Sequence, residues 1–315
     1  MAKYTTPSGI ELHYEAHGHS SNPPVMLIMG LGAQLTTWPT EFIDKLVEKH
    51  LYVICFDNRD VGLSSKLHKH GKPKLMLNVI KRTFRMPEAI PYTLEDMAND
   101  VTSLMDGLNI SKAHLVGTSM GGMIAQIIAA KHHQRCISLV SMMSSPSGPA
   151  KSKSSFKVLF KLLRTGRNLR NKRSLIEQNV KLNQLIGSPA FPIEESQLWK
   201  LATTNIERCH YPDGYRRQLA AVAFSRNRVP LLNQINVPTL ILHGSEDPLI
   251  PWQIGVETAI HIPKAKIHIV RGMGHNIPPV LCAKLTKKIA KHIYKAEQKA
   301  GKNPKRKSSP WAGDF

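Results

Sequence analysis

The chain has few acidic residues and few cysteines, and it lacks any long hydrophobic run. Its 315 residues include 43 lysines and arginines against 22 aspartates and glutamates, which gives a formal net charge of +21. No stretch reaches the roughly 18 consecutive apolar residues that a membrane-spanning helix needs. The first residues, 1–6, contain no apolar segment typical of a signal peptide. We therefore expect no transmembrane anchor and a cytoplasmic location.

Cysteine spacing excludes two further classes of protein. The four cysteines lie far apart, without a C-x-x-C pair and without a histidine cluster in register, at Cys55, Cys136, Cys209 and Cys282. A disulfide framework or a zinc site needs closer and paired spacing, so we expect reduced thiols and no metal. The hydrophobic fraction of 42% is that of a globular protein. The length suits one large α/β domain, alone or with a sizeable insertion.

The most informative stretch is Gly117-Thr118-Ser119-Met120-Gly121. An apolar, strand-like run over 113–116 leads into it, and a helical pattern over 120–130 follows. Strand, sharp turn and helix form the context that a G-x-S-x-G nucleophile elbow requires. The two glycines leave room for a strained serine, and the start of the helix directs the N–H of Met120 toward a developing oxyanion. Ser119 is therefore the candidate nucleophile.

Alternation of buried strands and helices predicts an α/β fold with a mostly parallel, doubly wound sheet. Strand-like runs occupy 10–15, 25–29, 51–56, 113–116 and 136–143, and helical patterns occupy 38–49 and 93–108. Parallel strands joined by helices give such a sheet, and ligands bind at the carboxyl ends of its strands. Leu31, Asp57 and Ser119 all fall at such ends. Further strands are expected at 238–243 and 266–270, and a last helix at 279–295.

The loop after the second of these strands, Gly30-Leu31-Gly32, is a candidate for the other half of an oxyanion hole. Its glycines allow a close approach of the backbone to a ligand, and the N–H of Leu31 is the proposed donor. An ordinary glycine-rich turn is the alternative. The polar turn at 57–64 either holds structure through an Arg–Asp pair or lines the site, and we favour the structural role.

Between the two halves of the sheet, the sequence predicts an inserted helical cap. After the linker at 145–149, helical patterns cover 156–163, 173–186, 193–209 and 211–224, without a convincing strand. We expect core segments at 1–147 and 234–297, the cap at 148–233, and a basic, disordered tail at 298–315. Phe191, Trp199 and Phe224 are candidates for an apolar substrate pocket, together with Gly30 and Gly32; core packing is the alternative for the aromatic residues.

An acid and a base follow the serine in the order that this elbow needs. Asp247 lies in the loop after the strand at 238–243 and is the candidate that orients an imidazole. Its neighbour Glu246 stays an alternative, since spacing does not exclude it. His275 lies on a glycine-flanked loop after the final strand, downstream of both Ser119 and Asp247. It is the candidate general base.

These motifs together resemble the α/β-hydrolase fold family across nearly the whole chain. The stretches at 57–64 and 186–192 are similar to bacterial carboxylesterases grouped with aclacinomycin methylesterase. The resemblance implies hydrolysis of a small to medium apolar ester through an acyl-enzyme, without a metal or an organic cofactor. Lactone, carbon–carbon or perhydrolase chemistry on the same triad, and a slow-turnover ligand receptor, remain alternatives.

A basic stretch within the expected cap suggests a second kind of interaction. Residues 151–173 carry many lysines and arginines, with no acid, and apolar residues lie among them at helical spacing. Such a segment either associates weakly with an anionic membrane or is a cap helix with a solvated basic face, and we favour the cap helix. No recognised motif accompanies the charge, so nucleic acid is not an expected partner. The oligomeric state is not determined by the sequence.

Overall fold

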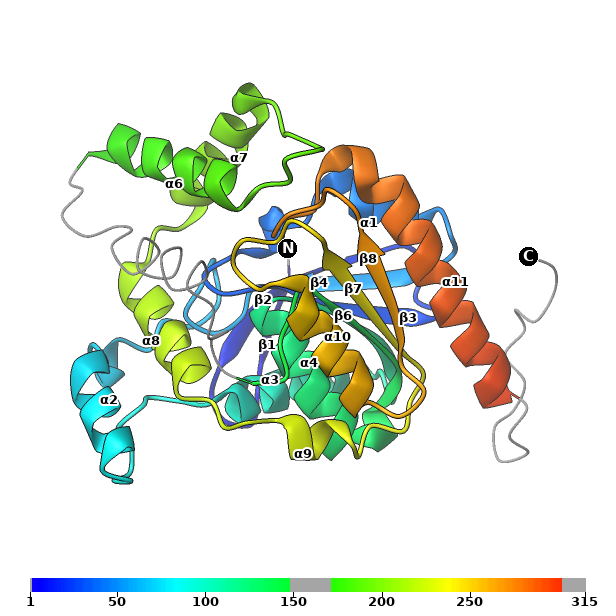
Figure 1. The fold of residues 1–315 in the computed structure, drawn as a ribbon, viewed down its shortest axis with the longest axis horizontal. Helices are drawn as coiled ribbons and strands as arrows, with labels where there is room; N and C mark the ends of the chain where they lie inside the picture. Colours follow the sequence, from blue (N-terminus) through cyan, green and yellow to red (C-terminus); the bar gives the residue numbers. More distant parts are fainter. Residues whose placement is uncertain (1, 148–170, 302–315) are drawn as a thin grey trace.

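The computed structural model describes residues 2–147 and 171–301. Its centre is an eight-stranded sheet in the order β1-β2-β4-β3-β5-β6-β7-β8 (Figure 1). The strands are β1 (Ala2–Thr5), β2 (Glu11–His17), β3 (Pro24–Ile28), β4 (Tyr52–Phe56), β5 (Ala113–Thr118), β6 (Cys136–Met142), β7 (Thr239–Gly244) and β8 (Lys266–Val270). The pairs β1–β2 and β2–β4 are antiparallel, and all other pairs are parallel. The expected fold class is confirmed.

Helices cover both faces of the sheet. One face packs against α3 (Leu94–Gly107), α4 (Met120–Lys131) and α10 (Trp252–His261), and the other against α1 (Thr40–Val47) and α11 (Cys282–Gly301). The central strands β3, β5 and β6 are buried on both faces, which is why they read as continuous apolar runs. Helix α3 begins with a capping box in which Thr93 and Asp96 bond each other's backbone N–H, as its sequence predicts.

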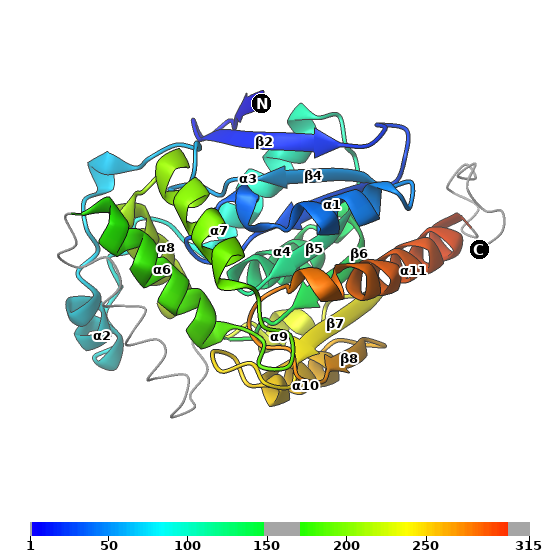
Figure 2. The ribbon, with the colours of Figure 1, turned by 90° about the horizontal axis from the view of Figure 1, so that it is seen from above.

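Four helices lie between β6 and β7: α6 (Lys172–Ile186), α7 (Glu195–Arg208), α8 (Pro212–Ala223) and α9 (Val229–Leu232). Helices α6 and α7 pack on each other around a small apolar core and stand beside the carboxyl edge of the sheet (Figure 2). The predicted helices at 173–186, 193–209 and 211–224 correspond to α6, α7 and α8. The predicted helix at 156–163, most of the basic stretch and most of the tail lie outside the described residues.

The remaining short elements are α2 (Leu75–Thr83) and four 3-10 turns at Leu35–Thr37, His68–His70, His133–Arg135 and Pro279–Leu281. The sequence reasoning did not anticipate β1, α2 or α10. Strand β1 is short and mostly exposed, so it lacks the hydrophobic pattern of a buried strand. Among the described helices, none is long and apolar enough to cross a membrane.

Candidate active site

Ser119 stands on a strained turn between β5 and α4. Its backbone has φ 53° and ψ −119°, a conformation that costs energy in any residue with a Cβ. A Cβ at Gly117 would lie 2.2 Å from the carbonyl oxygen of Gly121, and a Cβ at Gly121 would lie 2.0 Å from that of Ile28. Only glycine fits at both positions. The turn is further held by the hydroxyl of Ser144, which donates to the carbonyl oxygen of Ser119 over 2.7 Å.

The structure brings Ser119, His275 and Asp247 together in one hydrogen-bonded row. His275 Nε2 lies 3.0 Å from Ser119 Oγ, and His275 Nδ1 lies 2.7 Å from Asp247 Oδ2. These contacts fix one arrangement of protons: Nδ1–H donates to the carboxylate, and Nε2 accepts from the serine hydroxyl. The three residues come from loops after β5, β7 and β8, so the parallel sheet places them at one edge despite their separation in the chain.

Asp247 is buried and fully engaged as an acceptor. Its Oδ1 accepts the backbone N–H groups of Leu249 and Ile250 over 2.9 and 2.8 Å, which leaves Oδ2 for His275. Burial on its own raises the pKa of Asp247, but the Coulomb interaction with His275 and the hydrogen bonds from His243 and His275 outweigh it. The pKa therefore lies below its ordinary value, and the carboxyl is ionised at neutral pH.

The neighbouring carboxylate, Glu246, lies elsewhere. Its side chain is exposed and accepts a hydrogen bond from the hydroxyl of Ser245, its own neighbour in the chain. A residue that the sequence reasoning missed supports Asp247 instead: the fully buried His243 donates from Nε2 to the carbonyl oxygen of Ile250 and lies 3.4 Å from Asp247 Oδ2. His243 ends a buried strand, and no sequence pattern separates it from an ordinary packed histidine.

The loop after β3 lies directly beside Ser119. A Cβ at Gly30 would lie 3.2 Å from Ser119 Cβ, closer than ordinary contact, so glycine lets this loop lie directly against the serine. Among the described residues, no acceptor bonds the N–H of Leu31. The N–H of Met120 belongs to the first turn of α4, where helix geometry supplies no acceptor. Two backbone donors from separate elements thus border the serine.

Gln218 of α8 holds this loop in place. Its Oε1 accepts the N–H of Gly32 over 2.8 Å, and its Nε2 donates to the carbonyl oxygen of Arg59 over 2.8 Å. The side chain is completely buried within α8. Since Gly32 is the next residue after Leu31, this amide fixes the orientation of the backbone beside Ser119. The sequence gives no signal for it, because the two partners are distant in the chain.

Two buried ion pairs join the turn after β4 to the helices of the inserted segment. Asp57 accepts from Arg208 of α7 over 2.7 Å, and Asp60 is paired with Arg217 of α8 over 2.8 Å. A third pair joins Arg59 to Asp100 of α3 over 2.6 Å. The turn at 57–64 thus has the structural Arg–Asp pairing that was favoured from sequence, and its residues 60–62 also line the cavity described next.

A cavity of about 1660 Å³ opens above Ser119. Its walls come from the loop after β3, the elbow, the 72–77 segment and helices α6, α7 and α8, and most of the surface they offer is apolar. Gly30, Leu31, Gly32, Ser119, Met120 and His275 all belong to these walls. Tyr215 of α8 packs against Gly32, whose φ of +69° suits glycine. The space is large enough for a sizeable apolar ligand.

The three aromatic residues expected in the pocket are placed elsewhere. None of Phe191, Trp199 and Phe224 belongs to the described wall of this cavity. Phe191 packs against the core beneath α11, Trp199 packs in the small core of α6 and α7, and Phe224 is buried under the guanidinium of Arg82. Their expected pocket role is therefore corrected to packing: Trp199 lies in α7, Phe191 in the connection between α6 and α7, and Phe224 directly after α8.

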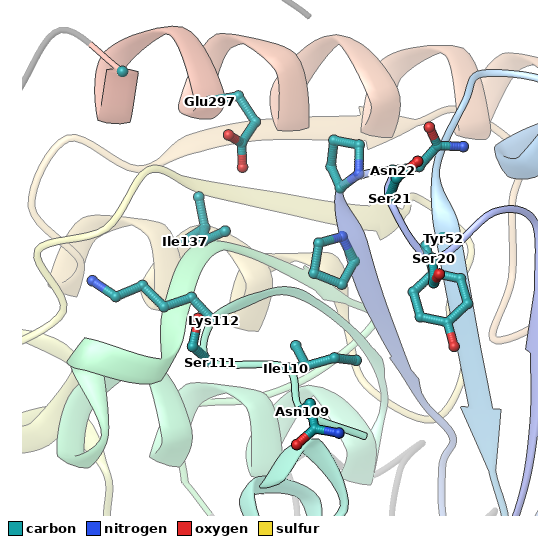
Figure 3. A pocket seen from close by; sticks show the side chains of 13 residues that line it. Ser20, Ser21, Asn22, Tyr52, Asn109, Ile110, Ser111, Lys112, Ile137 and Glu297 are labelled. Atoms are coloured by element: carbon teal, nitrogen blue, oxygen red, sulfur yellow. The ribbon is translucent and has the colours of Figure 1, made fainter. Parts of the chain in front are cut away.

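A smaller hollow of about 340 Å³ lies at the amino ends of the strands, at the opposite edge of the sheet (Figure 3). Tyr52 begins β4, Lys112 precedes β5 and Ile137 is the second residue of β6, and Glu297 faces the hollow from α11. Glu297 also bonds Nε2 of the buried His114 over 2.9 Å. This hollow shares no residue with the cavity at Ser119.

One described cluster has ligand types suited to a metal: Glu15, His17 and Cys55, whose candidate ligand atoms lie within 4.8 Å of one another. The register places Glu15 directly opposite Cys55 across β2 and β4. Burial raises the pKa of the Cys55 thiol to about 12. A neutral thiol is a poor metal ligand, because metals bind the thiolate.

The fold and the serine turn define a class of protein, and the comparisons with known proteins agree with it. Residues 23–279 match the family described as alpha/beta hydrolase fold. The rhodomycin D methylesterase DnrP of Streptomyces peucetius is 23% identical, over 92% of this chain and 97% of that protein. The monoacylglycerol lipase abhd6-B of Xenopus laevis is 26% identical, over 88% of this chain and 77% of its own length.

Among solved structures, the enol-lactonase from Burkholderia xenovorans LB400 superposes with a TM-score of 0.69 at 20% identity, covering 94% of this chain and all of that one. Because the family match spans most of the sequence, this chain belongs to the α/β-hydrolase fold family. The expected resemblance to methylesterases of this family is confirmed.

Proposed function

We propose that the chain is a serine hydrolase of carboxylic esters, with Ser119 as nucleophile, His275 as general base and Asp247 as the residue that orients the imidazole. The observation that carries the proposal is the continuous row of hydrogen bonds from Asp247 through His275 to Ser119. The low pKa of Asp247 keeps this carboxylate charged, so it stabilises the imidazolium that forms when His275 takes the proton of Ser119.

The reaction follows from this geometry in two halves. Ser119 Oγ attacks the ester carbonyl while His275 Nε2 accepts its proton, and the N–H groups of Leu31 and Met120 stabilise the oxyanion. His275 then protonates the leaving alcohol, which departs and leaves an acyl group on Ser119. In the second half, His275 takes a proton from water, the resulting hydroxide attacks the acyl group, and Ser119 regains its proton as the acid leaves.

The cavity and the relatives both favour an apolar ester of small to medium size as substrate. The walls above Ser119 are mostly apolar, and similar proteins include a methylesterase and a monoacylglycerol lipase. The inserted segment contributes α6, α7 and α8 to these walls. We assign residues 148–233 to a cap domain on a core made of 1–147 and 234–297, since the cap helices cover the carboxyl edge of the sheet.

Substitution of the nucleophile tests the proposal. Ser119→Ala should lower kcat on p-nitrophenyl butyrate by about 10⁴-fold to 10⁶-fold, because a triad acts as a unit. Labelling with a fluorophosphonate should disappear in the same variant. Ser21→Ala, an exposed serine at the opposite edge of the sheet, is the matched control and should keep full activity. Full activity in Ser119→Ala contradicts the proposal. Labelling of the wild type without turnover of the ester favours the alternative of a slow-turnover ligand receptor.

A further inference from the structure

Helix α2 is built with its apolar side facing outward. Of the twelve large hydrophobic side chains that are exposed among the described residues, six lie between 76 and 86: Met76, Leu77, Val79, Ile80, Phe84 and Met86. Met76 is 77% exposed and Phe84 is 72% exposed. A surface helix of a globular protein normally directs such side chains to the core, so this arrangement is inverted. A contiguous apolar patch of this kind marks an interaction site.

The opposite side of α2 is polar and attaches the helix to the protein. Asn78 is buried and exchanges two hydrogen bonds with the backbone of Ala89, at 3.0 and 2.9 Å. Arg82, one turn later, donates to the carbonyl oxygens of Ala223, the last residue of α8, and Ser225, which follows it. These bonds fix the rotation of the helix about its axis. The outward orientation of Val79, Ile80 and Phe84 is therefore set by specific contacts rather than left open.

Positive charge surrounds the apolar patch. No acidic residue occurs between Asp60 and Glu88, and that interval contains Lys66, Lys69, Lys72, Lys74, Lys81, Arg82 and Arg85. Lys74 and Arg85 flank the helix at its two ends and are exposed. A second copy of this strongly basic chain would be repelled from such a face. An anionic lipid surface instead offers negative headgroups for the basic residues and an acyl-chain region into which the apolar side chains can insert.

The patch also adjoins the cavity at Ser119. Leu75, Met76 and Leu77, from the first half of α2, belong to the cavity wall, and so do Lys72 and Lys74. In Figure 1, α2 projects from the body of the molecule beside α8, which itself lines the cavity. A lipid surface in contact with α2 would therefore face the cavity rim, as delivery of an apolar substrate from that surface requires.

We propose that α2 and its flanking residues 72–86 dock the protein on the surface of anionic lipid bilayers, with Val79, Ile80 and Phe84 inserted at the interface. These residues are other than those of the basic stretch at 151–173. Docking does not depend on the proposed ester hydrolysis, because none of these three side chains lines the cavity or touches Ser119. Its role in supplying the cavity rests on the proposed function.

Flotation of the full chain with vesicles tests the docking surface. The wild type should bind phosphatidylcholine vesicles that contain phosphatidylglycerol, bind pure phosphatidylcholine far more weakly, and dissociate at high salt. The variant Val79→Ser/Ile80→Ser/Phe84→Ser should bind about tenfold more weakly or worse, because the inserted apolar groups are gone. The exposed pair Ile260→Ser/Val280→Ser is the matched control and should bind as wild type does.

Two further measurements keep the outcomes distinct. The triple variant should hydrolyse a soluble short-chain ester as wild type does, which shows that it is folded, and Ser119→Ala should still bind vesicles. Docking is overturned if the wild type fails to bind, or if the triple variant binds equally well. It is also overturned if a photo-crosslinker at position 80 links to a second copy or to another segment of the same chain in the presence of anionic vesicles.

Discussion

Two adjacent carboxylates, Glu246 and Asp247, differ in what surrounds them rather than in their chemistry. Asp247 is buried, accepts two backbone N–H groups and bonds His275, whereas the side chain of Glu246 is exposed and accepts a hydrogen bond from its neighbour Ser245. From the sequence alone, both fitted the spacing. The distinction comes from the direction in which the loop after β7 turns each side chain, which residue identity does not encode.

This difference predicts unequal effects of two matched substitutions. Asp247→Asn should lower kcat on an activated ester by about 10⁴-fold, because an amide favours the wrong tautomer of His275 and does not stabilise the imidazolium. Glu246→Gln should keep kcat within about twofold of wild type, as expected for an exposed side chain away from the reacting atoms. Steady-state kinetics of both variants checks the assignment. Equal losses in the two variants would contradict it.

At the scale of elements, α8 acts as a brace between two loops of the sheet. Gln218 joins the loop after β3 to the turn after β4, and Arg217, its neighbour, is paired with Asp60 in that same turn. Both side chains are almost completely buried. The loop that carries the Leu31 donor thus depends on a helix from the inserted segment, far along the chain.

Replacement of this amide should weaken the oxyanion site without removing it. Gln218→Leu leaves the N–H of Gly32 without its acceptor, so the loop that carries Leu31 loses its fixed orientation. We expect kcat to fall by about tenfold to a hundredfold, with a smaller change in KM, since the lost interaction acts mainly in the transition state. Gln234→Leu, an exposed glutamine beyond α9, serves as control. A change in KM alone would argue against the bracing role.

Much of the fold and of the candidate site follows from the sequence because the signals are local. The buried strands β3, β5 and β6 are continuous apolar runs, and the elbow needs glycine at fixed offsets from Ser119. What the sequence did not predict depends on distant partners. Gln218 acts through Gly32 and Arg59 across the fold, His243 supports Asp247 through the shape of the loop after β7, and Phe224 packs under Arg82 of α2, which composition does not reveal.

For the whole molecule, stability depends on pH through histidines that are neutral when folded. Burial between α11 and the sheet lowers the pKa of His292 from 6.5 to about 4, although its hydrogen bond to the carbonyl of Pro238 partly opposes this. The unfolded chain therefore binds a proton that the folded chain excludes. The contribution of His292 is complete above pH 6.5 and is lost as the pH falls toward 4.

Substitution of His292 should flatten this dependence. In His292→Gln, the free energy of unfolding should change less between pH 6.5 and 4 than in wild type, because the group that titrates in that window is gone. Urea denaturation at a series of pH values measures the effect. His19→Gln, an exposed substitution, should leave the slope as in wild type. An unchanged slope in His292→Gln would refute the assignment.

Strands β6 and β7 are direct neighbours, with Met142 paired to Leu242, although the whole inserted segment separates them in sequence. The inserted segment therefore begins and ends at neighbouring strands, and the register of these strands does not depend on the length of the segment. The entropic cost of bringing the two ends of such a segment together grows only slowly with its length. Insertions or deletions in this segment that spare the α8 contacts can thus reshape the cavity walls while the order and register of the strands stay the same.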